Sequence, residues 1–143
     1  MVRNVELVQL LANESDKGSL IAIEGSDTIP FDIARVYYIY GVGAGDRRGF
    51  HSHKDLEQVL ICVNGSVKIL VEDGFTRDVI ELNSPDQGLY VGPMVWREMF
   101  DFSEGAVLMV LASRKYMPSD YEKDHERFLS SARECFEARK DAN

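Results

Sequence analysis

The stretch RGFHSHKDLE at residues 48–57 decides the fold that we predict. Side chains of an extended strand point alternately to its two faces. His51 and His53 are two residues apart, so they lie on the same face and both imidazoles face one volume. Glu57 follows four residues after His53, where an apolar run begins.

Short apolar runs separated by turn residues continue on both sides of this stretch, and this pattern is typical of a β-sandwich or barrel. Asn64-Gly65 and Asp73-Gly74 each lie between two such runs, and each predicts a β-hairpin. The runs 59–63 and 107–111 are apolar on both faces, so we expect the barrel interior to cover one face and a second sheet or subunit to cover the other. The expected strands are 19–24, 35–40, 49–53, 57–63, 66–71, 76–82, 88–91, 95–100 and 106–112.

The period of the pattern changes after Pro118. Apolar residues recur at helical spacing from Tyr121 to Phe136, and Ser119 or Asp120 can cap a helix. We therefore predict one amphipathic helix over about residues 119–140, packed on the outside of a β-barrel formed by about residues 1–116. The whole chain, residues 1–143, is expected to be one domain.

The composition is that of a soluble globular domain, with 45% hydrophobic and 28% charged residues in a chain of 143. Its 24 acidic and 16 basic residues give a net charge of -8, which repels polyanions, so nucleic acid is not an expected partner. Cys62 and Cys135 are too few for a disulfide framework, and no run approaches the ~20 apolar residues that span a bilayer. We expect a cytoplasmic protein with no membrane partner.

The spacing of His51, His53 and Glu57 resembles the first motif of a cupin, an all-β double-stranded β-helix or jelly roll in which that trio often binds a metal. In a cupin metal site the last ligand is a histidine of a second motif, and Arg97 occupies that position here. An arginine has no lone pair to give, so a four-ligand site cannot form. Two histidines and one glutamate could still hold a metal, but the Arg97 cation opposes a divalent ion. We therefore expect no metal, and the same cation suits an anionic substrate or an enediolate.

Simpler interpretations exist for these residues. A single histidine is usually an ordinary polar residue of a half-exposed strand, but two on one face beside Arg48 favour a site. Tyr37, Tyr38 and Tyr40 are strand formers, and at most one of them, on the inward face, donates a hydroxyl to the site.

Beyond the cupin motif, nearly the whole chain resembles the dTDP-4-keto-6-deoxyglucose 3,4-ketoisomerases of bacterial deoxysugar biosynthesis. The stretch 48–51 is also similar to the active-site strand of dTDP-sugar 3,5-epimerases, which work without metal. The matching segments are Gly18-Ser19-Leu20, Ile23-Glu24, 35–39, 48–54, 57–60, Gly65-Ser66, 88–93, 95–99 and 111–113.

The resemblance implies a homodimer that exchanges strands, dTDP-4-keto-6-deoxyglucose as the substrate, and acid–base catalysis that yields a dTDP-3-keto-6-deoxyhexose through an enediol. It makes His51 the principal base, His53 its partner, Tyr37 a nearby hydroxyl and Arg48 a ligand of the sugar nucleotide. A histidine near its ordinary pKa of ~6.5 can both accept and return a proton. No cofactor is expected, because the electrons move within the sugar.

The sequence departs from the family pattern at two positions. Many members have histidine where Arg97 stands and arginine where Lys17 stands. We expect both side chains at the mouth of the pocket, in contact with the substrate, so the configuration at C4 of the product stays open. Two alternatives also stay open, a metal-dependent cupin enzyme such as a dioxygenase or a phosphomannose-type isomerase, and a non-catalytic sugar-binding cupin.

Overall fold

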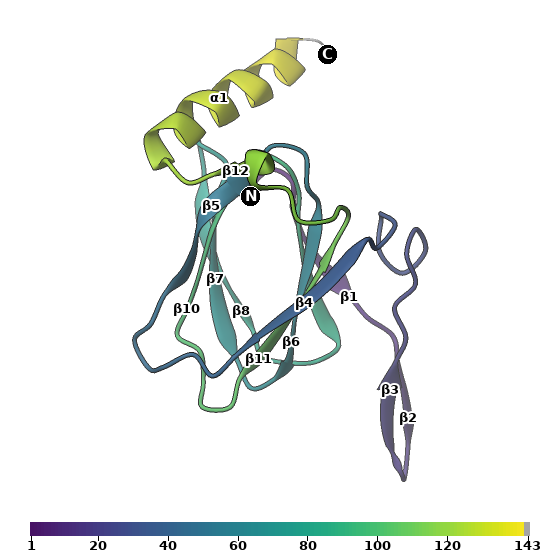
Figure 1. Cartoon of the computed structure of the whole chain (residues 1–143). Coiled ribbons are helices and arrows are strands. Elements are labelled where there is room, and N and C mark those ends of the chain that lie inside the picture. The colour runs from purple at the N-terminus through teal and green to yellow at the C-terminus, as the bar shows by residue number, and fades with distance from the viewer. Residues whose placement is uncertain (142–143) are drawn as a thin grey trace.

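Two five-stranded antiparallel sheets face each other in the computed structural model, which describes residues 1–141 (Figure 1). The predicted all-β jelly roll with a C-terminal helix is confirmed. One sheet has the strand order β1-β9-β6-β11-β4 and the other has the order β12-β5-β10-β7-β8, while β2 and β3 form a separate hairpin. The strands are β1 Val5–Gln9, β2 Ala12–Ser15, β3 Gly18–Ile21, β4 Arg35–Tyr40, β5 Arg48–His53, β6 Gln58–Asn64, β7 Val67–Glu72, β8 Arg77–Leu82, β9 Gln87–Val91, β10 Trp96–Phe100, β11 Val107–Ala112 and β12 Tyr121–Glu122.

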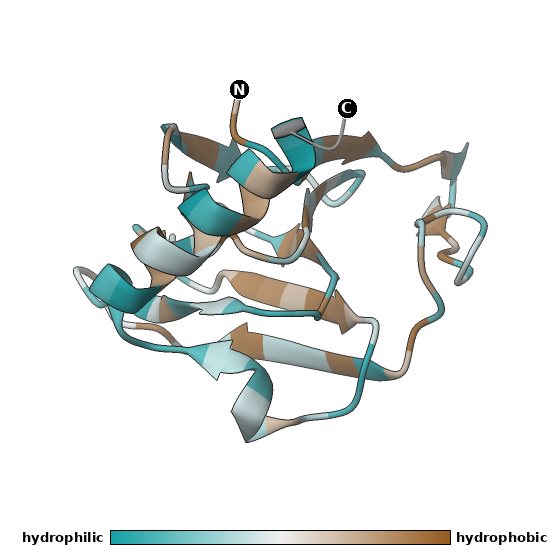
Figure 2. Cartoon of the chain, turned by 90° about the horizontal axis from the view of Figure 1, so that it is seen from above, coloured by the Kyte–Doolittle hydropathy of each residue, from teal (hydrophilic) through white to brown (hydrophobic). Residues whose placement is uncertain are grey.

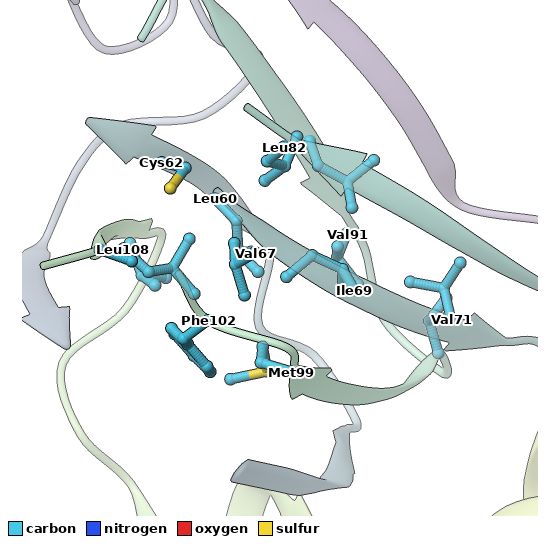
Figure 3. Close-up of a cluster of buried hydrophobic side chains, with 14 of the residues drawn as sticks. Leu60, Cys62, Val67, Ile69, Val71, Leu82, Val91, Met99, Phe102 and Leu108 are labelled. Carbon is cyan, nitrogen blue, oxygen red and sulfur yellow. The ribbon is translucent and has the colours of Figure 1, made fainter. Parts of the chain in front are cut away.

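The main core fills the space between the two sheets (Figure 3). Side chains on β7 alternate along the strand, and Val67, Ile69 and Val71 are fully buried in this core. They meet residues from the opposite sheet, among them Leu60 of β6 and Leu108 of β11. This period of two is what an antiparallel sheet with one face on a core requires.

The outer faces of β6 and β11 are also covered, as their apolar sequence predicts. Val59, Ile61 and Leu111 pack into a second buried cluster with Leu10, Ile29 and Phe31. Here the cover comes from the chain's own N-terminal third rather than from a second sheet.

The two turn predictions have different outcomes. Asp73-Gly74 joins β7 to β8, which pair as a hairpin with Glu72 opposite Arg77, so this prediction is confirmed. The hairpin prediction at Asn64-Gly65 is wrong, because β6 and β7 belong to different sheets. Gly65 has a φ of +76° and lies so close to Ser103 that a Cβ would collide with its side chain. Asn-Gly therefore marks a tight corner between the sheets, where Gly65 supplies a positive φ that a hairpin turn would also require.

The N-terminal strands β1 and β2 were not predicted, and the helix begins later than predicted. Residues Pro118–Asp120 form a 3₁₀ turn, β12 follows, and helix α1 spans His125–Asp141. Asp124 caps α1, since its carboxylate accepts a hydrogen bond from the backbone N–H of Arg127 at 3.1 Å. The Asp120 carboxylate bonds elsewhere, as described below, and so is not a cap.

Helix α1 lies on the outside of the barrel, as predicted. Phe128, Ala132 and Phe136 are buried against Leu70 and Trp96. Figure 2 shows that hydrophilic residues occupy much of the outward face of the helix. Among residues 1–141, no helix combines the length and the apolar character that a membrane crossing requires.

Candidate active site

Three strands, drawn from both sheets, bring most of the predicted site residues together. His51 and His53 lie on β5, Tyr37 on β4 and Arg97 on β10. Arg97 is the register partner of His51 in the β5–β10 ladder, and the register shifts directly after it. The bulge depends on Gly49, which has a φ of +94° and lies where a Cβ would be 2.8 Å from the Arg97 carbonyl oxygen.

The two histidines share one face, as the spacing predicts, and their ring centroids are 5.0 Å apart. His51 Nδ1 lies 3.0 Å from the carbonyl oxygen of Gly49, so the neutral ring donates from Nδ1 and keeps a lone pair on Nε2. Burial and the nearby Arg97 cation lower the pKa of His51 to about 4. The expectation of a pKa near 6.5 is therefore wrong, and the imidazole is an uncharged proton acceptor at neutral pH.

His53 is fully buried behind His51. Its Nδ1 lies 2.9 Å from Oδ2 of Asp120, whose Oδ1 accepts the backbone N–H of Asp55 at 2.8 Å. Burial and the Arg97 cation lower the pKa of His53, and its Nε2 has no hydrogen-bond partner among the described residues. Tyr121 packs on both imidazoles, with centroids 5.0 Å from His51 and 4.4 Å from His53.

An open groove of about 530 Å³ runs past His51. Its wall carries three cationic side chains, those of Arg35, Arg48 and Lys123. Although the chain is acidic overall, this local concentration of positive charge suits an anionic ligand. The remaining lining residues are Val36, Tyr37, Ile39, Gly49, Met99, Tyr116 and Tyr121.

Of the predicted site residues, Tyr37, Arg48 and His51 line this groove, whereas His53, Arg97 and Lys17 do not. Arg97 is 1% exposed and lies beneath the groove wall, so it does not reach the pocket mouth. Lys17 is exposed in the turn of the β2–β3 hairpin, which projects away from the barrel (Figure 1). The expectation that both side chains meet a ligand at the mouth therefore does not hold within one chain.

The cupin trio of two histidines and Glu57 does not assemble. Glu57 accepts a hydrogen bond from the Tyr90 hydroxyl at 2.7 Å. Tyr90 packs on the outer face of the β1-β9-β6-β11-β4 sheet, away from the histidines. Gln58, one residue later, points inward instead and is 2% exposed. Within residues 1–141, no three His, Cys, Asp or Glu side chains are arranged to hold a metal ion.

Sequence reasoning missed Gln58, Asp120 and Tyr121. The amide of Gln58 connects Arg97 to Tyr37, accepting from Arg97 Nη1 at 2.7 Å and donating to the Tyr37 hydroxyl at 3.1 Å. Alternation counted from Leu60, which faces the main core, gives Gln58 an inward direction. Because β6 is apolar on both faces, its sequence alone does not show which face is the inner one. No local signal places Asp120 and Tyr121 in the site, because residues 119–140 read as one helix.

Comparisons with known proteins find similarity over most of the chain. The family model described as FdtA, WxcM-like, C-terminal matches residues 3–133. A TDP-4-oxo-6-deoxy-alpha-D-glucose-3,4-oxoisomerase of Aneurinibacillus thermoaerophilus is 53% identical over 112 residues, which are 78% of this chain and 81% of the relative.

Two solved structures are similar over almost the whole chain. QdtA, a sugar 3,4-ketoisomerase from Thermoanaerobacterium thermosaccharolyticum in complex with TDP, has a TM-score of 0.93 and 51% identity, covering 95% of this chain and 99% of that one. A variant of QdtA with a histidine changed to asparagine, in complex with TDP-4-keto-6-deoxyglucose, has a TM-score of 0.92 and 50% identity, covering 94% and 97%.

We predict that the imidazole of His51 titrates near pH 4 in the unliganded protein. The pH dependence of its Cε1–H chemical shift measures this midpoint. Arg97→Met should raise the pKa, because it removes the buried cation that disfavours a charged ring. Arg48→Met is the control, because Arg48 is an exposed arginine on β5, the strand that carries His51. A midpoint near the ordinary value of ~6.5 in the unaltered protein would contradict the assignment.

A second prediction concerns the tautomer of His53. In Asp120→Asn the amide oxygen stays on the N–H of Asp55, so the NH₂ group faces His53 Nδ1 and the ring proton moves to Nε2. The ¹⁵N shifts of His53 should report this switch, whereas Asp55→Asn, which alters an exposed carboxylate, should leave them unchanged. Retention of the Nδ1 proton in Asp120→Asn would show that Asp120 does not set the tautomer.

Proposed function

The chain belongs to the FdtA family, whose relatives described above are sugar 3,4-ketoisomerases, and we propose that it converts dTDP-4-keto-6-deoxyglucose into a dTDP-3-keto-6-deoxyhexose. It is an isomerase that moves a carbonyl between two carbons of one sugar. The observation that carries the proposal is the neutral imidazole of His51 on the wall of a groove that also presents Tyr37 and three cations.

The reaction needs proton transfers. His51 Nε2 accepts the C3 proton, and the electron pair of the broken C–H bond forms the C3–C4 double bond while the carbonyl pair moves to the C4 oxygen. That oxygen takes a proton, which gives the enediol. The C3 hydroxyl then gives a proton to the solvent, replacing the one that the solvent supplied to the C4 oxygen, and becomes the carbonyl. The His51 imidazolium delivers its proton to C4 and returns to the neutral state. Atoms and electrons balance within the sugar and the acid–base groups.

The low pKa of His51 fits a shuttle of this kind. The ring is uncharged before the substrate binds, and the diphosphate and the developing enediolate then bring negative charge that opposes the effect of Arg97. Once protonated beside a buried cation, the imidazolium gives its proton up readily, which favours delivery to C4. The ring centroids of His53 and His51 are 5.0 Å apart, and Asp120 fixes the orientation of His53. His53 is the second imidazole of the site.

The groove cations are suited to the nucleotide. Arg48 lies on β5 three residues before His51, Arg35 begins β4, and Lys123 follows β12. Guanidinium groups make charge-assisted hydrogen bonds to phosphate oxygens, and these would hold the diphosphate while the sugar reaches His51. Since Cys62 and Cys135 are free thiols, we also propose a cytoplasmic location.

We further propose that the protein works as a homodimer built through the β2–β3 hairpin. An isolated two-stranded hairpin is at best marginally stable, yet this one pairs with no other strand of residues 1–141. Leu20 on the hairpin is 60% exposed, and Tyr38 and Tyr40 on the edge strand β4 are 64% and 70% exposed. A second copy would cover these apolar side chains, and Lys17 at the hairpin tip would then reach the neighbouring subunit.

The function is tested by incubating the protein with dTDP-4-keto-6-deoxyglucose in D₂O and following C3 and C4 by NMR. We expect the C3 proton signal to disappear and deuterium to enter at C4 of a 3-keto product. His51→Asn should slow this by on the order of 10²- to 10⁴-fold, because an amide has no titratable nitrogen. His125→Asn, outside the groove, is the matched control.

The same experiment separates the alternatives. Binding of the nucleotide sugar without deuterium exchange would favour a sugar-binding protein. Turnover that is lost with a chelator and restored by an added divalent metal would favour a metal-dependent enzyme.

The dimer is tested by light scattering on size-exclusion fractions. We expect the mass of two 16.2 kDa chains in the unaltered protein and of one chain in Leu20→Glu, because a charge cannot be buried in an apolar interface without a partner. Val79→Glu, at an exposed valine of β8, should remain dimeric. A monomer in the unaltered protein at micromolar concentration would contradict the proposal.

A further inference from the structure

Arg97 cannot act on a ligand in the groove directly. The guanidinium is buried, and it donates from Nη1 to Gln58 Oε1 at 2.7 Å and from Nη2 to the Val95 carbonyl oxygen at 2.8 Å. Neither Arg97 nor Gln58 lines the groove, whereas Tyr37 does. Any influence of Arg97 on a bound sugar through hydrogen bonds must therefore pass through another side chain.

The amide of Gln58 has its orientation fixed by Arg97. A guanidinium only donates hydrogen bonds, so the atom of Gln58 that faces it must be the oxygen. The NH₂ group then faces Tyr37, and Gln58 Nε2 donates to the hydroxyl oxygen at 3.1 Å. Both hydrogen bonds are therefore donated in the same direction, from Arg97 to Gln58 and from Gln58 to Tyr37. This common direction is the polarity of the series.

This polarity decides what the Tyr37 hydroxyl can do. Its oxygen already accepts from Gln58, and an amide NH₂ cannot accept in return, so the hydroxyl proton points away from Gln58. Within residues 1–141 no protein acceptor receives that proton, and the hydroxyl belongs to the groove wall that also carries His51. Burial raises the pKa of Tyr37, which keeps the phenol protonated at neutral pH.

We propose that Arg97 and Gln58 are positioning residues that hold Tyr37 as a hydrogen-bond donor aimed at the substrate oxygen on which negative charge develops. This inference rests on the proposed ketoisomerase function. When His51 removes the C3 proton, the electron pair released reaches the C4 oxygen, and a donor already oriented towards it stabilises the enediolate without reorganisation. Tyr37 keeps its proton in this step, because it contributes a hydrogen bond and not a transfer.

Gln58→Glu reverses the polarity with little change in shape. The carboxylate still accepts from Arg97, but its second oxygen accepts from Tyr37, so the hydroxyl proton turns away from the groove. We expect kcat to fall by about 10²-fold, the typical cost of losing one oxyanion donor, with a much smaller change in KM. In a Tyr37→Phe background the same substitution should cost little more, because the hydroxyl that it redirects is already absent.

Arg97 provides an independent pair of variants. Arg97→Lys keeps a group that only donates, so it should retain most of the activity, whereas Arg97→Met frees the Gln58 amide to turn and should lower kcat. Equal losses in the two variants would overturn the proposal. So would an equal effect of Gln58→Glu with and without the Tyr37 hydroxyl, which is the result expected of a purely structural residue. The Arg97 pair still decides the proposal if Gln58→Glu does not fold.

A readout without turnover separates this inference from the proposed function. In unliganded protein labelled with ¹³Cζ-tyrosine, Gln58→Glu should raise the pKa of Tyr37 above that of the unaltered protein, because the hydroxyl then bonds to a carboxylate. If the unaltered protein fails to turn over the nucleotide sugar, the proposed function fails whatever this titration gives. If turnover is normal and the pKa of Tyr37 does not respond, the proposed role of Arg97 and Gln58 in orienting Tyr37 is wrong while the proposed function stands.

Discussion

The burial of one permanent cation, the guanidinium of Arg97, is the constraint on which the site depends. In the part of the chain that the structure describes, its hydrogen bonds go to neutral oxygens of Gln58 and Val95 and not to a carboxylate. A buried charge without a bonded counter-ion acts strongly on its neighbours, because little water screens it. Burial of the rings, reinforced by this cation, lowers the pKa of His51 and of His53 and keeps both neutral. The cation also allows the Gln58 amide only one orientation.

The barrel keeps these groups at fixed distances, because each is carried by a strand and not by a loop. Tyr37 and Gln58 come from one sheet, and His51 and Arg97 from the other, so the site spans the gap between the two sheets. A shift of one residue on β6 would exchange Gln58 for Glu57 and place a carboxylate between Arg97 and Tyr37. Strand register therefore selects a hydrogen-bonding amide at the point where the cupin motif suggests a metal ligand.

The sequence predicted what depends on local periodicity. Alternation placed His51 and His53 on one face, and helical spacing placed Phe128 and Phe136 on the buried side of α1. The prediction failed where a strand or side chain pairs with a partner that is distant in sequence. Asn64-Gly65 announces a turn but not which strands pair, and the spacing from His53 to Glu57 does not show that Tyr90 holds the carboxylate. Lys17 is at the tip of a hairpin that projects away from the barrel, and no local pattern in the sequence shows that it lies apart from the histidines.

Helix α1 lies outside the barrel, yet it helps to position the site. On β10, Arg97 points towards the histidines while its neighbour Trp96 faces the helix, where its ring lies 5.6 Å from that of Phe128. The segment that leads into α1 carries Asp120 and Tyr121 against His53, and β12 pairs Tyr121 with His53 in register. Packing of the helix on Trp96 therefore holds the segment that fixes the His53 tautomer. The C-terminal segment, which sequence periodicity treats as a cover for the barrel, is in physical terms part of the site.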